Sequence, residues 1–371
     1  MKTKLICLYL PQFHETEDNN KWWGAGYTDW TAARNAKKYF KTHKQPRVPL
    51  NCRYYNLAEE DAATLKWQAD MARKYGIYGF CIYHYWFGGK RELEKPVEIL
   101  RNHKEIDISY CLCWDSTTWR RTWYADKFEQ EILIEQDYGD KDMWRRHFED
   151  LLPDFRDQRY IKINNRPVFH FYRAYSIGCL AEMRAFWDEL ARQNGFDGIY
   201  LISGDLEHRK SEKLLQSVDA FYNFEPNHAF YEGRKSPYVV FTVARAGIVK
   251  RINKLFKKEY LPDIRAAKGI YDLIERYDTE PVKKTYLGLF PGYDDTPRRQ
   301  LKGAVYINNR IEYFEQCLRR QLERSEKLEN EFVYINAWNE WGESAYLEPD
   351  EENGYLYLET IKRVVEEMEN R

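Results

Sequence analysis

Several common functional signatures are missing from this sequence. No uncharged apolar run is long enough to span a membrane, and the run at residues 5–10 is too short for the core of a signal peptide. Neither the phosphate-binding pattern Gly-x-x-x-x-Gly-Lys-Ser/Thr nor the dinucleotide-binding pattern Gly-x-Gly-x-x-Gly occurs, and no metal-ligand cluster is visible. We therefore expect no cofactor and no bound metal.

Charge and cysteine content further limit the kinds of protein that this chain can be. The chain has 58 Lys and Arg against 59 Asp and Glu, so its net charge of −1 gives no long-range attraction for nucleic acid. Its 7 cysteines are odd in number, scattered and mostly inside apolar segments, without zinc-site spacing. We interpret them as reduced core residues of a cytoplasmic protein.

Aromatic residues are abundant. The chain contains 30 Tyr, 19 Phe and 12 Trp, 16% of all residues, which is more than a core of this size requires. Part of the surplus is expected to line a groove for a sugar, although any single ring is more often a core residue. The candidate sugar platforms are Trp22, Trp23, Trp86, Trp114 and Trp119.

Apolar runs of strand length alternate with segments of helical periodicity, which is typical of βα units around a parallel sheet. Eight runs are expected to be strands: residues 5–10, 77–83, 108–114, 167–173, 199–203, 218–224, 286–290 and 332–338. The expected helices are residues 59–75, 94–103, 141–152, 180–194, 209–216, 261–277, 308–328 and 355–368. We predict an α/β (β/α)8 TIM barrel. An open doubly wound sheet is the alternative fold.

The predicted domain organisation is a single catalytic barrel of residues 1–371. Long connections follow strand one, at residues 14–52, and strand six, at residues 228–285. Polar and aromatic residues gather where the strands end, and in a barrel those ends meet on the face that carries active sites. Residues 9–14, 83–86, 114–115, 172–173, 225–228, 291–299 and 338–343 form this set.

Two carboxylates stand at the end of the last strand. Glu340 and Glu343 lie three residues apart, with Trp338 and Trp341 beside them. Acid–base cleavage of a glycosidic bond needs two carboxyl groups whose environments separate their pKa values. The alternative is that both are solvated acids at a helix start, where the helix dipole favours negative charge.

The motifs resemble the WbsX-like family of polysaccharide-locus proteins, described as glycosyltransferases and similar to the endo-α-mannosidases of glycoside hydrolase family ninety-nine. The resemblance spans the chain and rests on residues 9–14, 22–30, 75–80, 86–90, 111–114, 294–299 and 336–343. It implies that Glu340 acts as a base on the sugar's 2-hydroxyl, giving a transient 1,2-anhydro sugar, and that Glu343 protonates the leaving oxygen and later deprotonates water. The chain departs from the family at Thr117, where many members carry a glutamate. A sugar hydroxyl or charge that this glutamate would bind in those members would therefore be bound differently here.

Further side chains on the predicted face are candidates for binding a glycan. Asp294 is equally suited to a local turn. Arg298 could hold a carboxylate or phosphate of the substrate. Histidines at strand ends are often core residues whose hydrogen bonds are made within the protein. The substrate-binding candidates are Tyr9, Gln12, His14, Trp22, Trp23, His84, Tyr85, Trp86, Trp114, Asp115, His228, Asp294, Arg298, Trp338, Asn339, Trp341 and Tyr346.

Residues 245–258 form a predicted basic amphipathic helix. Packing of its apolar face on the barrel is the favoured interpretation, and contact with an anionic membrane surface or a lipid-linked glycan is the alternative.

The leading functional hypothesis is a retaining, endo-acting glycoside hydrolase for a bacterial surface polysaccharide of the O-antigen or capsule type. A glycosyltransferase of lipopolysaccharide biosynthesis is the second, and Arg298 and Arg299 are its candidates for a donor-phosphate site. Asp140 and Asp142 match the Asp-x-Asp pattern of some sugar-nucleotide transferases, but so short a match is common by chance and it lies outside the aromatic face. A non-catalytic glycan-binding protein is the third.

Overall fold

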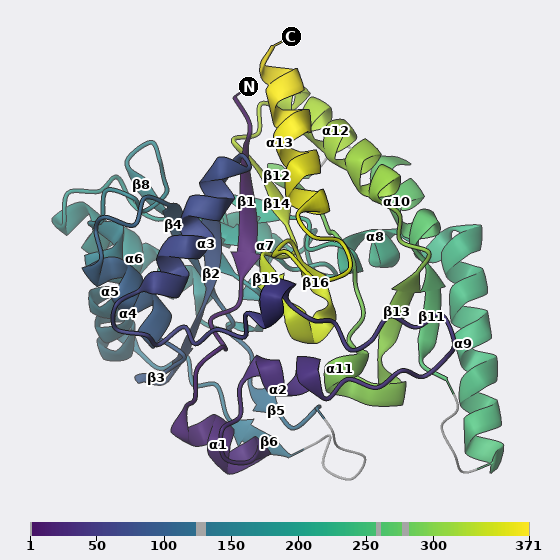
Figure 1. Cartoon of the computed structure of the whole chain (residues 1–371). Coiled ribbons are helices and arrows are strands. Elements are labelled where there is room, and N and C mark those ends of the chain that lie inside the picture. Colours follow the sequence, from purple (N-terminus) through teal and green to yellow (C-terminus); the bar gives the residue numbers. More distant parts are fainter. Residues whose placement is uncertain (1, 124–130, 257–260, 277–281, 371) are drawn as a thin grey trace.

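Eight parallel strands close into a barrel in the computed structural model, which describes residues 2–123, 131–256, 261–276 and 282–370 (Figure 1). The first strand pairs with both the last and the second, and these two pairings close the sheet. In barrel order the strands are β1 (Lys4–Tyr9), β2 (Ile77–Phe87), β4 (Ser109–Trp114), β8 (Arg166–Phe171), β9 (Tyr200–Ser203), β10 (Ala220–Tyr222), β12 (Thr285–Leu289) and β14 (Phe332–Ile335). The prediction of a (β/α)8 barrel is confirmed.

The expected helices also form, each within the predicted segment or a few residues of it, because their apolar residues recur with a helical period and pack against the strands. They are α3 (Ala63–Lys74), α4 (Lys95–Asn102), α5 (Lys141–Phe155), α6 (Leu180–Gln193), α7 (Glu212–Ser217), α10 (Ala267–Arg276), α12 (Ile311–Lys327) and α13 (Leu356–Glu369).

Additional elements cover the carboxyl end of the barrel, at the lower side of Figure 1. Three of them come from the long connection after β1, at residues 14–52, and the others from the connections after β2, β4, β12 and β14. They are α1 (Glu17–Trp23), α2 (Asp29–Arg34), η1 (Leu50–Cys52), β3 (Lys90–Glu92), β5 (Trp119–Arg120), β6 (Ile132–Ile134), α11 (Thr296–Arg299), η4 (Gln300–Lys302), β15 (Asn339–Glu340), η5 (Trp341–Glu343) and β16 (Ala345–Tyr346). The short β7 (Lys162–Ile163) and η2 (Ala174–Ser176) flank β8.

Strand alternation divides the barrel strands into an inner and an outer face. On the inner face, Cys81, Cys111, His170, Tyr222 and Tyr334 are fully buried. His170 Nε2 lies 2.7 Å from the Tyr334 hydroxyl. Cys113, two residues after Cys111 on β4, lies on the same strand face. All 7 cysteines are free thiols, and Cys52 and Cys179 lie outside the buried core.

The connection after β10 contains a strand that was not predicted. It holds α8 (Asn227–Glu232), η3 (Gly233–Lys235), α9 (Pro237–Phe256) and β11 (Asp263–Ala266) before α10. Part of the predicted helix at 261–277 is therefore a strand, because β11 pairs with β13 (Ala304–Ile307) in a small parallel sheet outside the barrel.

The favoured interpretation of the basic helix was wrong. Within α9, Ile248, Ile252 and Leu255 are 56%, 44% and 77% exposed, so the expected apolar face is not packed on the barrel. The predicted segment also includes residues 257 and 258, which lie outside the described residues. Across the described ranges, no helix combines the length and apolar character needed to traverse a bilayer.

Candidate active site

A buried arginine gathers three carboxylates at the carboxyl end of the barrel. Arg298 lies on α11, and its Nε donates to Asp29 Oδ1 of α2 at 2.9 Å. Its Nη2 donates to Glu340 Oε2 at 2.8 Å, and its Nη1 donates to Glu343 Oε1 at 3.0 Å. Because two nitrogens of one guanidinium bind Glu340 and Glu343, these carboxyl groups lie side by side on the predicted face.

The two glutamates occupy unequal environments. Glu340 has 8% of its side chain exposed, whereas Glu343 has 25%. Burial raises the pKa of Glu340 to about 8, with Arg298 opposing the shift and the Glu343 charge adding to it. A single guanidinium cannot neutralise three carboxylates, so the cluster favours retaining one proton near neutral pH.

Four tyrosines lie close enough to this pair for its charges to affect them. Burial raises the pKa of Tyr83 and Tyr85 on β2 well above the usual range, and the Glu340 charge adds to both shifts. Burial likewise raises the pKa of Tyr172 and Tyr293, with a contribution from Glu343. The ring centroids of Tyr83 and Tyr172 are 6.3 Å apart. Their phenols are therefore neutral hydrogen-bonding groups beside the carboxylates.

A group of half-buried indoles extends from the carboxylates toward the loops. The rings of Trp23 and Trp123 stack at 5.6 Å, and those of Trp22 and Trp119 meet edge to face at 6.0 Å. The Arg298 guanidinium lies 4.9 Å from the Trp123 ring centroid. Such exposed aromatic faces can pack against the C–H surfaces of a sugar.

Asp115 adds a further carboxylate next to this group. Its Oδ2 accepts from the Trp119 indole at 3.1 Å, and its Oδ1 accepts from the Thr117 hydroxyl at 2.7 Å. Burial raises the pKa of Asp115. The hydroxyl at the position where the family glutamate was expected therefore holds Asp115 in place.

The structure separates the predicted residues on β2 by strand alternation. Tyr85 faces the carboxylates, whereas His84 and Trp86 point outward. His84 Nε2 lies 2.9 Å from His147 Nε2 of α5, and the Trp86 ring stacks on His147 at 4.5 Å. Burial lowers the pKa of His84 to about 3. Trp114 also packs outward, donating to the Trp86 carbonyl at 3.1 Å, so we no longer expect these three to contact a sugar.

Two of the predicted substrate-binding residues are buried behind the glutamates and bond to Glu348. Trp338 and Trp341 are fully buried, and their indoles donate to Glu348 at 3.1 and 2.7 Å. Tyr55 and Gln68 also donate to Glu348, at 2.9 and 2.7 Å. Glu348 is thus a buried structural carboxylate, and the indoles that it orients are not sugar platforms.

The remaining buried candidates also bond within the protein. Tyr9 donates to Gln68, and the Asn339 side chain bonds the backbone of Leu10. Tyr346 donates to Asp350 and stacks on Trp341. His14 Nδ1 lies 3.1 Å from the Pro11 carbonyl, and Gln12 is buried, with its backbone carbonyl accepting from the Asp29 amide. His228 lies on α8, with Nδ1 3.1 Å from Glu225 Oε1.

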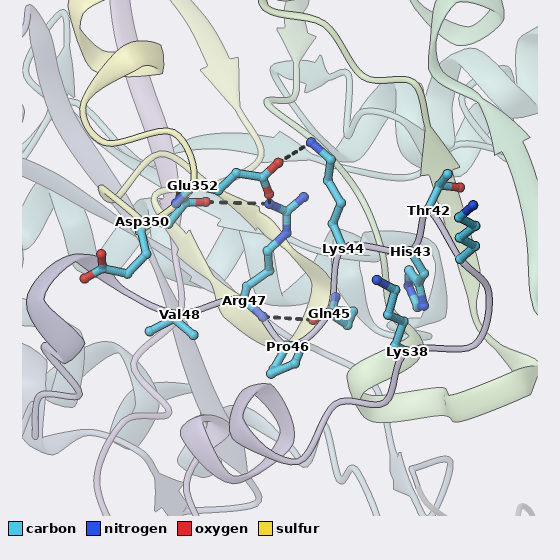
Figure 2. A pocket seen from close by; sticks show the side chains of 12 residues that line it. Lys38, Thr42, His43, Lys44, Gln45, Pro46, Arg47, Val48, Asp350 and Glu352 are labelled. Atoms are coloured by element: carbon cyan, nitrogen blue, oxygen red, sulfur yellow. Dashed lines mark hydrogen bonds and ion pairs between the residues drawn. The ribbon is translucent and has the colours of Figure 1, made fainter.

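Asp294 performs the local role that its turn sequence indicated. Its Oδ1 accepts from the Thr296 hydroxyl at 2.6 Å, and its Oδ2 lies 2.8 Å from both His43 Nε2 and Gln45 Nε2. These bonds tie the loop after β1 to the loop after β12. A cavity of about 410 Å³ lies beside this junction, where Figure 2 shows Lys44 and Arg47 reaching Glu352.

One group of possible metal ligands lies inside the barrel, contrary to the expectation from sequence spacing. Cys81, Cys111 and His170 each offer a ligand atom, and these atoms lie within 4.8 Å of one another. They come from three strands, so linear spacing could not reveal them. All three are fully buried beneath the site, and we assign them to the core.

Comparisons with known proteins agree with this architecture. The family model described as "Glycosyltransferase WbsX" matches residues 5–361. The chain belongs to this family. It is 30% identical over 369 residues to the protein WxcX of Xanthomonas campestris pv. campestris, and the match covers 97% of this chain and 49% of WxcX. The chain thus spans about half the length of the curated relatives it matches.

Solved structures show the same fold. A GH99 endo-α-mannosidase from Bacteroides thetaiotaomicron aligns with a TM-score of 0.59 at 14% identity, covering 99% of this chain and 97% of the mannosidase. A glycoside hydrolase-like protein aligns with a TM-score of 0.58 at 12% identity, covering 98% of this chain and 94% of the other. At these identities the likeness concerns the barrel alone.

Proposed function

We propose that this member of the WbsX family is a carbohydrate-active enzyme that cleaves glycosidic bonds of a bacterial surface polysaccharide or its precursor, as a retaining, endo-acting hydrolase. The observation that carries the proposal is the pairing of Glu340 and Glu343 on one buried guanidinium, beside half-exposed indoles. This arrangement supplies both acid–base groups and a surface for sugar rings.

In the proposed mechanism the Glu340 carboxylate accepts the proton of the sugar's 2-hydroxyl. The resulting oxygen attacks the anomeric carbon as the bond to the leaving oxygen breaks, and Glu343 donates its proton to that oxygen. Glu343, now ionised, then takes a proton from water, whose oxygen opens the 1,2-anhydro ring while Glu340 returns its proton to the 2-oxygen. Two inversions give net retention. The reactive form is the one in which the single proton of the pair lies on Glu343, and in that form the raised pKa of Glu340 makes its carboxylate a stronger base.

Arg298 has a positioning role in this proposal. Its side chain is 6% exposed and fully engaged by Asp29, Glu340 and Glu343. Holding both glutamates on one rigid planar group fixes their separation. Tyr83, Tyr85, Tyr172 and Tyr293 are the proposed partners for sugar hydroxyls.

Transfer from an activated donor is the second candidate, favoured by the family's description as glycosyltransferases. A donor phosphate needs a cation, but Arg298 is occupied by carboxylates, and Arg299 lies near Asp295 at 3.4 Å. Asp140 of the Asp-x-Asp match caps α5 by accepting from the Asp142 amide at 3.1 Å. Calorimetric titration with nucleotide sugars that releases heat for one donor would favour transfer over hydrolysis.

We also propose that residues 1–371 act as one catalytic barrel with residues 228–285 as an insertion, and that the protein works in the cytoplasm. The free state of all 7 thiols supports a reducing compartment. Both proposals concern only the 371 residues of this chain, which match about half of the longer relative WxcX.

The test is a panel of surface-polysaccharide oligosaccharides incubated with the protein, with products read by mass spectrometry. We expect shorter glycans from the parent protein and from the control Glu312→Gln, a surface change on α12, but none from Glu340→Gln or Glu343→Gln. A glycan that binds and remains intact with the parent protein would instead indicate a binding module. Equal cleavage by all four proteins would contradict the proposed pair.

A further inference from the structure

Helix α9 carries an exposed apolar stripe that the barrel does not cover. Phe241, Ile248, Ile252 and Leu255 are 70%, 56%, 44% and 77% exposed. Their spacings of seven, four and three residues place them on one side of the helix. Val239 and Thr242, in the first turns, are buried and anchor the helix to the protein. Contiguous exposed apolar surface of this kind commonly marks a binding surface.

Positive charge borders the stripe. Arg245 lies four residues after Phe241, and Arg251 lies three residues after Ile248, so both flank the stripe on the helix surface. The helix sequence also contains Lys250 and Lys254 and has no Asp or Glu. Arg245 Nη2 approaches Asp263 of β11 at 3.7 Å, and this is a weak, partly exposed pairing. The surface is therefore both apolar and cationic.

We propose that α9 docks on an anionic lipid surface. The apolar stripe would enter the boundary between headgroups and acyl chains, and the flanking Arg245 and Arg251 would contact lipid phosphates. Charge complementarity favours this occupant, because a helix with four cations and no acid offers nothing to the basic groups of a second copy of itself. A neutral apolar partner would leave those cations unused.

The position of α9 fits such a contact. It stands at the right edge of the molecule in Figure 1, apart from the helices that cover the barrel, and its C-terminal end lies at the same end of the molecule as α1 and the β5–β6 hairpin. Docking through this helix would therefore keep the proposed catalytic face beside the lipid surface. The lipid contact itself does not depend on the proposed hydrolysis.

Sedimentation of the full chain with vesicles tests this proposal. We expect binding to vesicles rich in phosphatidylglycerol, weakening as salt rises, and little binding to pure phosphatidylcholine vesicles. Ile248→Glu and Leu255→Glu should each reduce the bound fraction by about tenfold, because each puts a carboxylate at the apolar boundary. The matched control is Leu328→Glu, an exposed apolar position on the C-terminal end of α12, which should bind like the parent protein.

Two further measurements separate the outcomes. Glu340→Gln should bind vesicles normally, so loss of catalysis and loss of docking are distinguishable. Light scattering after size-exclusion chromatography reports whether the chain pairs with itself. A dimer that Ile248→Glu dissociates, together with no vesicle binding, would assign the stripe to contact between copies and overturn the proposal. Equal binding by the parent protein and both α9 variants would also overturn it.

Discussion

Two carboxylate networks lie eight residues apart after the last barrel strand, and they differ in what surrounds them. Glu348 is 3% exposed and accepts four hydrogen bonds from neutral donors. Glu340 shares a cation with two other carboxylates, one of which, Glu343, is partly open to solvent. Burial raises the pKa of Glu348 to about 7 and that of Glu340 to about 8.

A raised pKa therefore does not by itself identify an acid–base catalyst. Glu348 has no side open to a substrate, because both of its carboxylate oxygens are bonded to groups within the protein. In Glu340 and in Glu343, only one carboxylate oxygen is bonded to Arg298, and half-exposed aromatic rings adjoin the pair. Access and unequal environments distinguish the proposed catalytic pair from the structural carboxylate.

The largest expected effect separates the two networks by activity. Glu340→Gln and Glu343→Gln should each lower kcat on a cleaved glycan by at least about a thousandfold, because each removes a proton-transferring group. With an aryl glycoside, whose leaving group needs no proton, Glu343→Gln should recover much of the loss in kcat/KM, which reports the first bond cleavage, and Glu340→Gln should not. Initial rates on both substrates check this, and equal rates for both variants on both substrates would contradict the separate roles.

Removal of the shared cation should give the largest loss of stability. Arg298→Met leaves three neighbouring carboxylates without their partner, so the free energy of unfolding should fall by about 3–5 kcal/mol at neutral pH. The matched control is Arg299→Met, since that guanidinium is 52% exposed and its pairing should be worth less than about 1 kcal/mol. Urea unfolding of the two variants measures the difference, and similar losses would argue against a buried cluster.

Glu348→Gln should lower the stability of the fold more than it lowers the catalytic activity. The NH2 group that replaces one carboxylate oxygen in glutamine cannot accept from the donors it faces, so these buried donors lose their partner and the free energy of unfolding falls by about 1–3 kcal/mol. Activity per folded molecule should fall much less than in Glu340→Gln. Thermal unfolding together with kcat measures both effects. A loss of activity as large as that of Glu340→Gln, without a loss of stability, would place Glu348 in the reaction.

The smallest effect is a pH dependence of stability. The folded-state pKa of Glu348 is raised from 4.5 to about 7, so the folded protein retains a proton that the unfolded chain releases in this interval. Stability from this group is therefore present below about pH 4.5 and is lost as pH rises toward 7, by up to about 3 kcal/mol. The difference between parent protein and Glu348→Gln should show this slope. A difference that does not vary with pH would contradict it.

The fold followed from the sequence because the barrel strands are apolar runs that end in turn or polar residues, and strand ends on one face located Glu340, Glu343, Arg298 and Asp115. The sequence did not reveal which neighbours point inward. Predicting a strand that ends at residue 83, when β2 continues to Phe87, hid the alternation that separates Tyr85 from its neighbours.

Other errors came from contacts that are distant along the chain. Trp338 was predicted to bind substrate, but its indole donates to the buried Glu348. Arg298 was expected to bind a substrate anion, but it binds Asp29, which precedes it by 269 residues. Trp123 and Tyr293 were missed as separate candidates, although Tyr293 lay within a predicted strand-end segment. Such pairings depend on loop packing, which local patterns do not encode.

The most direct test of the central claim is the pH dependence of kcat/KM. The reaction needs Glu340 ionised while Glu343 holds the one proton of the pair, so kcat/KM of the parent protein should fall as pH rises through about 8, where that proton is lost. In Glu343→Gln, assayed with an aryl glycoside, only the base has to be ionised, so kcat/KM should instead rise with pH, and it should do so below pH 8 because the neighbouring negative charge that raises the Glu340 pKa is gone. A parent kcat/KM that keeps increasing above pH 8, or a Glu343→Gln profile that also falls through this range, would contradict a shared acid–base pair with Glu340 as the base.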